Sequence, residues 1–321
     1  MTSANDQQDG SSATADGGDT PIDDKDKKFA WPPLESNPEV FSDYLHSIGL
    51  SPSYSFGEIF GFDEDLLAFV PQPVLGVIVC HERLIPKSQY RPQDVGSVDN
   101  YNTVSYYMHQ SKTLDNACGI VACLHAIFNS PMVNADIDPN SILGRFRTGT
   151  ECLTPTERCT SLELNEEFRT VHATHASRGQ SQAITSDQSL VKCHYVAYVL
   201  DKSGKYLVEL DGTKAGPVVI EGNSIAEANE GVDLLRASIR EIQGKLERKE
   251  ISDSLSMMTL NLTQEWWNMR EMLSVDGGCT TIDDAWQRHC STYEYIDMTN
   301  ILHETTSIAL SLHSTFPRNR S

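Results

Sequence analysis

Basic residues are scarce in this sequence, and their scarcity argues against one class of function. The 321 residues include 25 Lys and Arg against 45 Asp and Glu, which gives a formal net charge of −20. Tight binding of nucleic acid depends on Lys and Arg side chains that neutralise phosphates, so we expect no nucleic-acid partner. The acidity favours solubility, and it would also speed the capture of a basic partner.

Long apolar runs are missing as well. The longest one, residues 66–80, is broken by Pro71 and Pro73 and is too short to span a bilayer. The polar, acidic segment 1–28 has the composition of a disordered tail and not that of a signal or transit peptide. We therefore expect no membrane partner, and a cytoplasmic protein that can also be nuclear.

The cysteines offer no metal or redox motif. There are eight of them, and none forms a C-x-x-C pair, so neither a zinc site nor a thioredoxin-type site is indicated. His172 and His175 lie close in sequence but have no neighbouring Cys or carboxylate cluster. We expect no metal, no cofactor and reduced thiols.

Apolar periodicity begins at Trp31. Asn37 and Pro38 have the preferences of a helix cap and a first helical residue, and the apolar stripe that follows ends at Gly49. Residues 83–102 and 172–190 are polar and predict loops, and long loops inside compact domains are often functional. The other expected elements are helices at 63–69, 116–127, 154 to about 165 and 232–249, strands at 74–79, 101–108 and 257–262, and a hairpin of 194–200 with 206–210.

Cys118 lies where the buried helix is expected to begin. A thiol attacks a carbonyl as thiolate, which a helix N-terminus and a nearby imidazolium both favour. Gly119 would let a substrate backbone come close. A cysteine in this position is also compatible with a plain core role, which is how we interpret Cys123, five residues further along the helix.

His194 and Asp211 lie at matching ends of the predicted hairpin. His194 begins its first strand and Asp211 follows its second. The start of one strand lies beside the end of its antiparallel partner, so the two residues should meet. A carboxylate there would hold the imidazole in one tautomer and stabilise its charged form. A purely structural His–Asp bond is the alternative.

Four segments of the chain, in this order, resemble the ubiquitin C-terminal hydrolase family. They are residues 31–40 (WPPLESNPEV), 69–74 (FVPQPV), 115–119 (DNACG), and 194–199 with 209–214 (HYVAYV and ELDGTK). The resemblance runs from Trp31 to about Leu262 and is greatest with the short, single-domain members. It implies an α/β (α+β) fold of the papain-like cysteine hydrolases, with a central antiparallel sheet flanked by helices and a knotted backbone.

The resemblance also implies domains, catalytic residues and a substrate. We expect a disordered tail at 1–28, a catalytic domain at 29–263 and an extension of uncertain structure at 264–321. Cys118, His194 and Asp211 would form the catalytic triad of a monomeric deubiquitinating hydrolase. The loop 172–190 matches the family's active-site crossover loop, whose length would limit substrates to small or unstructured adducts on the C-terminal glycine of ubiquitin. The contacts to ubiquitin would come from Leu34, Glu35, Asn37, Arg178, Gly179 and Gln180.

The oxyanion donor is where the chain departs from the family pattern. Members of the family carry a Gln six residues before the cysteine, and this chain has Lys112 there. A two-residue insertion, Ser111-Lys112, would make Gln110 the donor, together with the Cys118 backbone amide. The alternative places Lys112 in the hole, where an ammonium cannot copy the fixed geometry of an amide.

Two other functions stay open at this point. The insertion could spoil the oxyanion hole and leave a protein that binds ubiquitin without cleaving it. The substrate could also be a related modifier of the NEDD8 type. Turnover of a fluorogenic amide on ubiquitin distinguishes the first alternative from an active hydrolase, and side-by-side kinetics distinguish the second.

Overall fold

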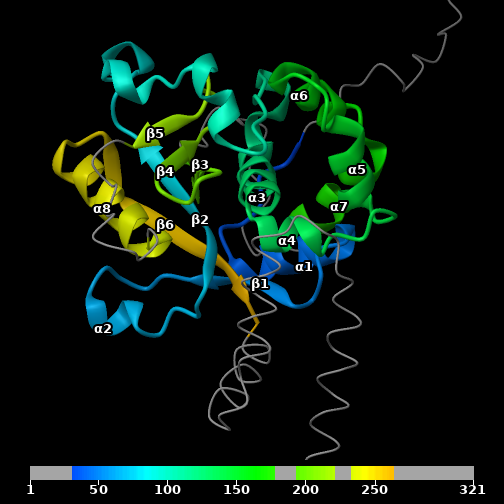
Figure 1. The fold of residues 1–321 in the computed structure, drawn as a ribbon, viewed down its shortest axis with the longest axis horizontal. Coiled ribbons are helices and arrows are strands. Elements are labelled where there is room, and N and C mark those ends of the chain that lie inside the picture. The colour runs from blue at the N-terminus through cyan, green and yellow to red at the C-terminus, as the bar shows by residue number, and fades with distance from the viewer. Residues whose placement is uncertain (1–30, 178–192, 221–232, 264–321) are drawn as a thin grey trace, which may run out of the picture. The chain divides into compact units, whose positions relative to one another are not determined.

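The computed structural model describes residues 31–177, 193–220 and 233–263 (Figure 1). Its strands form one antiparallel sheet in the order β1-β6-β2-β3-β4-β5. The strands are β1 (Tyr54–Glu58), β2 (Val74–Arg83), β3 (Cys193–Leu200), β4 (Leu207–Leu210), β5 (Val218–Ile220) and β6 (Ile251–Leu262). The predicted central antiparallel sheet is confirmed, while the knot stays a prediction.

Helices cover both faces of this sheet. They are α1 (Pro38–Ile48), α2 (Glu64–Leu67), α3 (Cys118–Asn129), α4 (Pro131–Ala135), α5 (Ile142–Thr150), α6 (Pro155–Glu163), α7 (Glu166–Ala176) and α8 (Leu234–Glu247). Helix α8 packs its apolar side onto the face that carries Val77 and Val196. Helix α3 lies on the other face, where its Ala126 approaches Gly76 of β2 so closely that a side chain at Gly76 would collide. Figure 1 shows the sheet between these two helices.

Local chemistry explains where the helices begin and end. Asn37 Oδ1 accepts a hydrogen bond from Glu39 N at 2.8 Å, with Pro38 in the first turn, and α1 ends at Gly49, whose φ is 113°. Thr154 and Glu157 form a reciprocal capping box at the start of α6. Both starts confirm the sequence predictions.

The predicted strand at 101–108 is wrong. Residues 98–103 form a 3-10 helix, and the segment after it has no place in the sheet. Its amides bond to side chains of α3 instead: Tyr106 N donates to Asn129 Oδ1 at 3.0 Å, and Met108 N donates to His125 Nε2 at 3.1 Å. An apolar run can therefore satisfy its backbone without a strand partner, which its periodicity does not reveal.

The predicted loop at 172–190 is wrong in its first part. Residues 172–176 are the last turns of α7, and residues 178–192 lie outside the described part of the chain. His172 is buried, stacks edge-on against Trp31 with ring centroids 4.9 Å apart, and bonds to Pro32 O at 2.6 Å. The polar character of His172 predicted a loop position, although its ring belongs to the core.

Candidate active site

The hairpin of β3 and β4 brings His194 and Asp211 together as the sequence predicts. His194 is the second residue of β3, and Asp211 directly follows β4. His194 Nε2 lies 2.8 Å from Asp211 Oδ1. Tyr107 fixes the turn after β4, because its hydroxyl donates to the carbonyls of Asp211 and Lys214 at 2.8 and 3.1 Å. The buried segment before α3 therefore braces the turn that carries the carboxylate.

The Asp211 carboxylate is buried and surrounded by donors. Its side chain is 1% exposed. Oδ1 accepts from Thr213 N at 2.9 Å and Thr213 Oγ1 at 2.8 Å in addition to His194, and Oδ2 accepts from Arg83 Nη2 at 2.6 Å. Burial works to raise the pKa of Asp211, but the charge and hydrogen bond of His194, with smaller help from Arg83, hold it well below its usual range. Asp211 is therefore a carboxylate at neutral pH.

Cys118 is the first residue of α3 and follows a 3-10 helix over Lys112–Ala117. It is 6% exposed, and its thiol lies close enough to the His194 imidazole to help raise the pKa of that ring. Since Nε2 of that ring faces Asp211, Nδ1 is the nitrogen left to face the sulfur. Position 118 is also the N-terminus of α3, where the helix dipole places a positive partial charge.

His194 carries a proton far more readily than an ordinary histidine. Burial opposes its charge and works to lower its pKa, but the Asp211 charge, the hydrogen bond that His194 donates to Asp211 and the nearby Cys118 side chain outweigh burial and raise the pKa to about 9. The imidazolium is thus the main form at neutral pH. This arrangement suits an ion pair between an imidazolium and a thiolate at the start of a helix.

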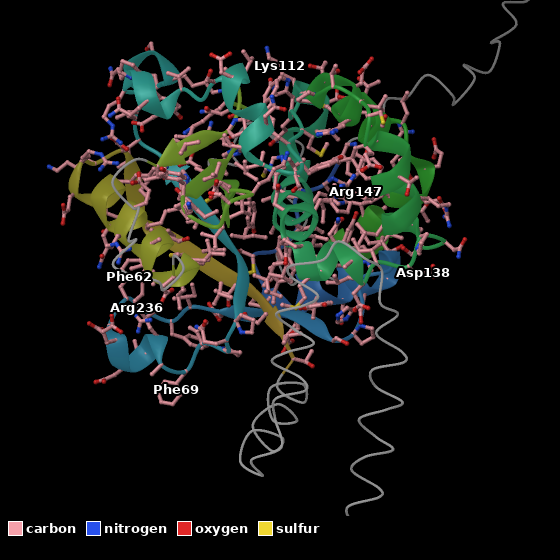
Figure 2. The ribbon with its side chains drawn as sticks, viewed as in Figure 1. Phe62, Phe69, Lys112, Asp138, Arg147 and Arg236 are labelled. Carbon is pink, nitrogen blue, oxygen red and sulfur yellow. The ribbon has the colours of Figure 1, made fainter. Side chains whose placement is uncertain are left out.

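The two candidate oxyanion donors have different surroundings. Gln110 N donates to Gly212 O at 2.8 Å, and its Nε2 donates to Leu114 O at 3.0 Å, so Gln110 lies between the Asp211 turn and the approach to α3. Lys112 is exposed on the surface (Figure 2). Ser111 caps the 3-10 helix and bonds to Glu163 of α6, which accommodates the two residues interpreted as an insertion. Which side chain donates to the oxyanion stays a prediction, and this geometry supports Gln110.

The predicted ubiquitin contacts fall into two groups. Leu34 is buried, while Glu35 and Asn37 are half-buried, and the Asn37 side chain already caps α1. Arg178, Gly179 and Gln180 lie outside the described residues. The structure thus assigns one of these residues a helix-capping role, and a role in binding stays a prediction for all six.

Arg83 and Thr213 were missed by the sequence analysis. Position 83 was assigned to a polar loop, but β2 extends through it. Strand alternation offered no dependable signal for Arg83, because the pairing of β2 with β6 is irregular between His81 and Arg83. Among the described residues, no group of three His, Cys, Asp or Glu side chains could hold a metal ion. No helix in the same part of the chain has the length and apolarity needed to cross a bilayer.

Comparison with known proteins gives a consistent result. A family profile described as "Ubiquitin carboxyl-terminal hydrolase, family 1" matches residues 31–245. The chain is 34% identical over 204 residues to a ubiquitin carboxyl-terminal hydrolase of Drosophila melanogaster, covering 59% of this chain and 82% of that protein. It is 37% identical over 194 residues to one of Aplysia californica, covering 59% of this chain and 85% of that protein.

A solved structure shares the fold. The crystal structure of the Trichinella spiralis UCH37 catalytic domain bound to ubiquitin vinyl methyl ester superimposes with a TM-score of 0.55 at 21% identity. The match covers 73% of this chain and 96% of that one. The two chains therefore share the arrangement of helices around an antiparallel sheet.

Proposed function

Because this chain belongs to the ubiquitin carboxyl-terminal hydrolase family, we propose that it is a thiol-dependent deubiquitinating hydrolase that acts at the C-terminal glycine of ubiquitin. The observation that carries the proposal is the bond between the His194 imidazole and the buried Asp211 carboxylate, and the Cys118 sulfur at the start of a helix helps to raise the pKa of the same imidazole. That arrangement supplies a nucleophile, a proton carrier and an orienting group in one chain.

The chemistry follows from the two protonation states. The Cys118 thiolate attacks the carbonyl carbon of the last glycine and forms a tetrahedral intermediate. The His194 imidazolium gives its proton to the leaving amine as the C–N bond breaks and a thioester remains. The neutral His194 then takes a proton from a water molecule, which hydrolyses the thioester and restores the ion pair. Asp211 keeps the ring oriented through both steps.

A direct assay tests this function. Purified wild-type protein is expected to release the fluorophore from an amide on the C-terminus of ubiquitin, with a higher kcat/KM than for the same amide on a NEDD8-type modifier. Tight binding of ubiquitin with no turnover would contradict the proposal. The function would then be to bind ubiquitin without cleaving it. A higher kcat/KM for the amide on the NEDD8-type modifier would make that modifier the substrate, with the same thiol mechanism.

Gln110 and Lys112 give a paired prediction about the oxyanion hole. Gln110→Ala is expected to lower kcat by about 100- to 1000-fold, the usual cost of one preorganised donor, with little change in KM. Lys112→Ala is the matched control, two residues away on the surface, and is expected to keep kcat within about twofold, as for most surface changes. Stopped-flow or plate kinetics on the ubiquitin amide measure both. The reverse pattern would move the oxyanion donor to Lys112.

The charge of His194 gives a prediction about pH. Acylation needs the imidazolium, whose pKa is raised to about 9. Activity is therefore expected to persist through neutral pH and to fall as pH rises through about 9, not through the ordinary value near 6.5. The pH dependence of kcat/KM on the ubiquitin amide measures this limb. A loss of activity centred near pH 6.5 to 7 would contradict the His194–Asp211 coupling.

Several features of the proposal derive from the sequence alone. The protein acts as a monomer in the cytoplasm, and in the nucleus as well. Its preference for small or unstructured adducts depends on a crossover loop that is largely outside the described residues. The net charge of −20 supports a basic protein partner such as the Arg- and Lys-bearing tail and face of ubiquitin.

A further inference from the structure

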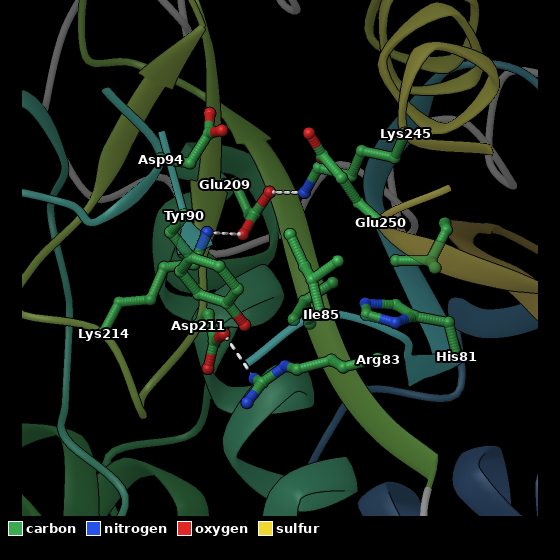
Figure 3. A pocket seen from close by; sticks show the side chains of 12 residues that line it. His81, Arg83, Ile85, Tyr90, Asp94, Glu209, Asp211, Lys214, Lys245 and Glu250 are labelled. Atoms are coloured by element: carbon green, nitrogen blue, oxygen red, sulfur yellow. Dashed lines mark hydrogen bonds and ion pairs between the residues drawn. The ribbon is translucent and has the colours of Figure 1, made fainter. Parts of the chain in front are cut away.

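Arg83 reaches the catalytic carboxylate from the side that His194 does not occupy. It is the last residue of β2, the strand that pairs His81 with His194. Its Nη2 donates to Asp211 Oδ2 at 2.6 Å (Figure 3). The same Nη2 donates to Thr213 Oγ1 at 3.0 Å. Thr213 in turn donates to Asp211 Oδ1 through its backbone and its hydroxyl. One guanidinium therefore holds both the carboxylate and the threonine that helps to orient it.

The other cations near this site are engaged elsewhere. Lys214 Nζ lies 2.5 Å from Glu209 Oε1, and Lys245 bonds to Glu209 Oε2 (Figure 3). Lys87 Nζ donates to Thr213 O at 2.7 Å. Among the described residues, Arg83 is thus the cation that forms an ion pair with the Asp211 carboxylate, apart from His194 itself.

The space beside this pair does not suggest a ligand. Arg83 and Asp211 line a cavity of about 30 Å³, room for water but far below what an organic ligand fills. The role of Arg83 is therefore directed at Asp211 and not at a bound molecule.

We propose that Arg83 is a positioning residue, which holds Asp211 so that Oδ1 faces His194 and whose charge opposes that of the imidazolium. The inference rests on the proposed thiol chemistry of the same site. Arg83 touches neither the sulfur nor the scissile carbonyl in this scheme, and it acts through Asp211. A simpler alternative is an ion pair that only stabilises the fold, with no effect on the histidine.

The charges around His194 set the expected sign. Titratable groups from several elements face the His194–Asp211 pair. Strand β2 contributes His81 and Arg83, β4 contributes Glu209, and the turn after β4 contributes Lys214. The others are Lys87 from the 3-10 helix after β2, Cys118 from α3 and Lys245 from α8. Arg83 works to lower the pKa of His194, against the larger upward effect of Asp211. Removing its charge should therefore raise that pKa and move the loss of activity to higher pH.

Arg83→Met tests the proposal, because methionine keeps an unbranched apolar stem and removes the charge and the donors. The expected result is a fall in kcat of about 10- to 100-fold, typical of losing a group that orients a reacting residue, with KM nearly unchanged. The alkaline limb of the pH profile should move upward. Arg83→Lys keeps the charge but loses the planar guanidinium. In this variant, activity should therefore be lost at the same alkaline pH as in wild type, while kcat should recover only in part.

A substrate-free readout separates this inference from the proposed function. Titration of the His194 ring by NMR in wild type and Arg83→Met is expected to show a higher pKa in the variant, whether or not ubiquitin is the substrate. Arg91→Met is the matched control, since Arg91 pairs with Asp94 at 2.5 Å and bonds to no triad residue. Arg83→Met could instead match wild type both in its His194 titration and in its kcat per folded molecule. Arg83 would then be a residue that only stabilises the fold. If Arg83→Met does not fold, Arg83→Lys decides: unchanged kcat would overturn the proposal.

Discussion

Cys118→Ala is expected to abolish turnover of a ubiquitin amide while leaving ubiquitin binding intact. The substitution removes the atom that forms the thioester, so kcat should fall by more than about 10⁴-fold, as for other nucleophile deletions. The Ala side chain fits the same first turn of α3, and the surface available to ubiquitin does not change. Kinetics and calorimetric titration with ubiquitin measure the two effects separately.

Cys123→Ala is the matched control for this loss. Cys123 lies five residues further along α3, is fully buried, and has a pKa raised well above the usual value by burial, so it is a protonated core thiol. Its truncation should lower the free energy of unfolding by about 1 kcal/mol and leave kcat per folded molecule unchanged. Comparable losses in the two variants, with both folded, would show that α3 cysteines matter for packing and not for chemistry.

Asp211→Asn is expected to have the second-largest effect. Asparagine is nearly isosteric but carries no charge, so it neither stabilises the imidazolium nor fixes the tautomer, and kcat should fall by roughly 10³- to 10⁴-fold. Because Asp211 is the main group that raises the pKa of His194 from 6.5 to about 9, the alkaline limb should move down toward 6.5. That direction is opposite to the one expected for Arg83→Met.

The stability of Asp211→Asn must be measured beside its kinetics. The variant leaves Arg83 facing an uncharged amide, and breaking a buried ion pair costs about 3–5 kcal/mol. Asp201→Asn is the control, since Asp201 also accepts several hydrogen bonds, from Ser203, Lys205 and Tyr206 in the turn between β3 and β4, without touching the triad. A wild-type kcat for folded Asp211→Asn would remove Asp211 from the catalytic account.

Local patterns predicted the hairpin half of the site well. The runs on either side of the turn at 201–205 form β3 and β4 in antiparallel register, and antiparallel geometry alone then places His194 beside Asp211. The contact with Cys118 could not be predicted from local pattern, because that residue is more than seventy positions away from His194 in the sequence and reaches it only through the packing of α3 against β3. Family resemblance, not periodicity, supplied that pairing.

The missed residues share a physical cause. Arg83 ends an apolar strand, and a charged residue at such a point is typical of a loop, so its pairing with a carboxylate 128 positions away is invisible to pattern analysis. Tyr107 and His125 were obscured in the same way, since side-chain hydrogen bonds within the core replace the strand ladder that the apolar run predicted. Polar groups in a core are satisfied by tertiary contacts, which no window of sequence contains.

In the proposed mechanism, the His194 imidazole makes the Cys118 sulfur the nucleophile. The most direct measurement is labelling of the wild-type protein with ubiquitin that carries a C-terminal vinyl methyl ester, followed by peptide mapping of the adduct by mass spectrometry. We expect one adduct, on Cys118, which is lost in Cys118→Ala and retained in Cys123→Ala. An adduct on the exposed Cys152 or Cys193, or labelling that survives Cys118→Ala, would contradict it.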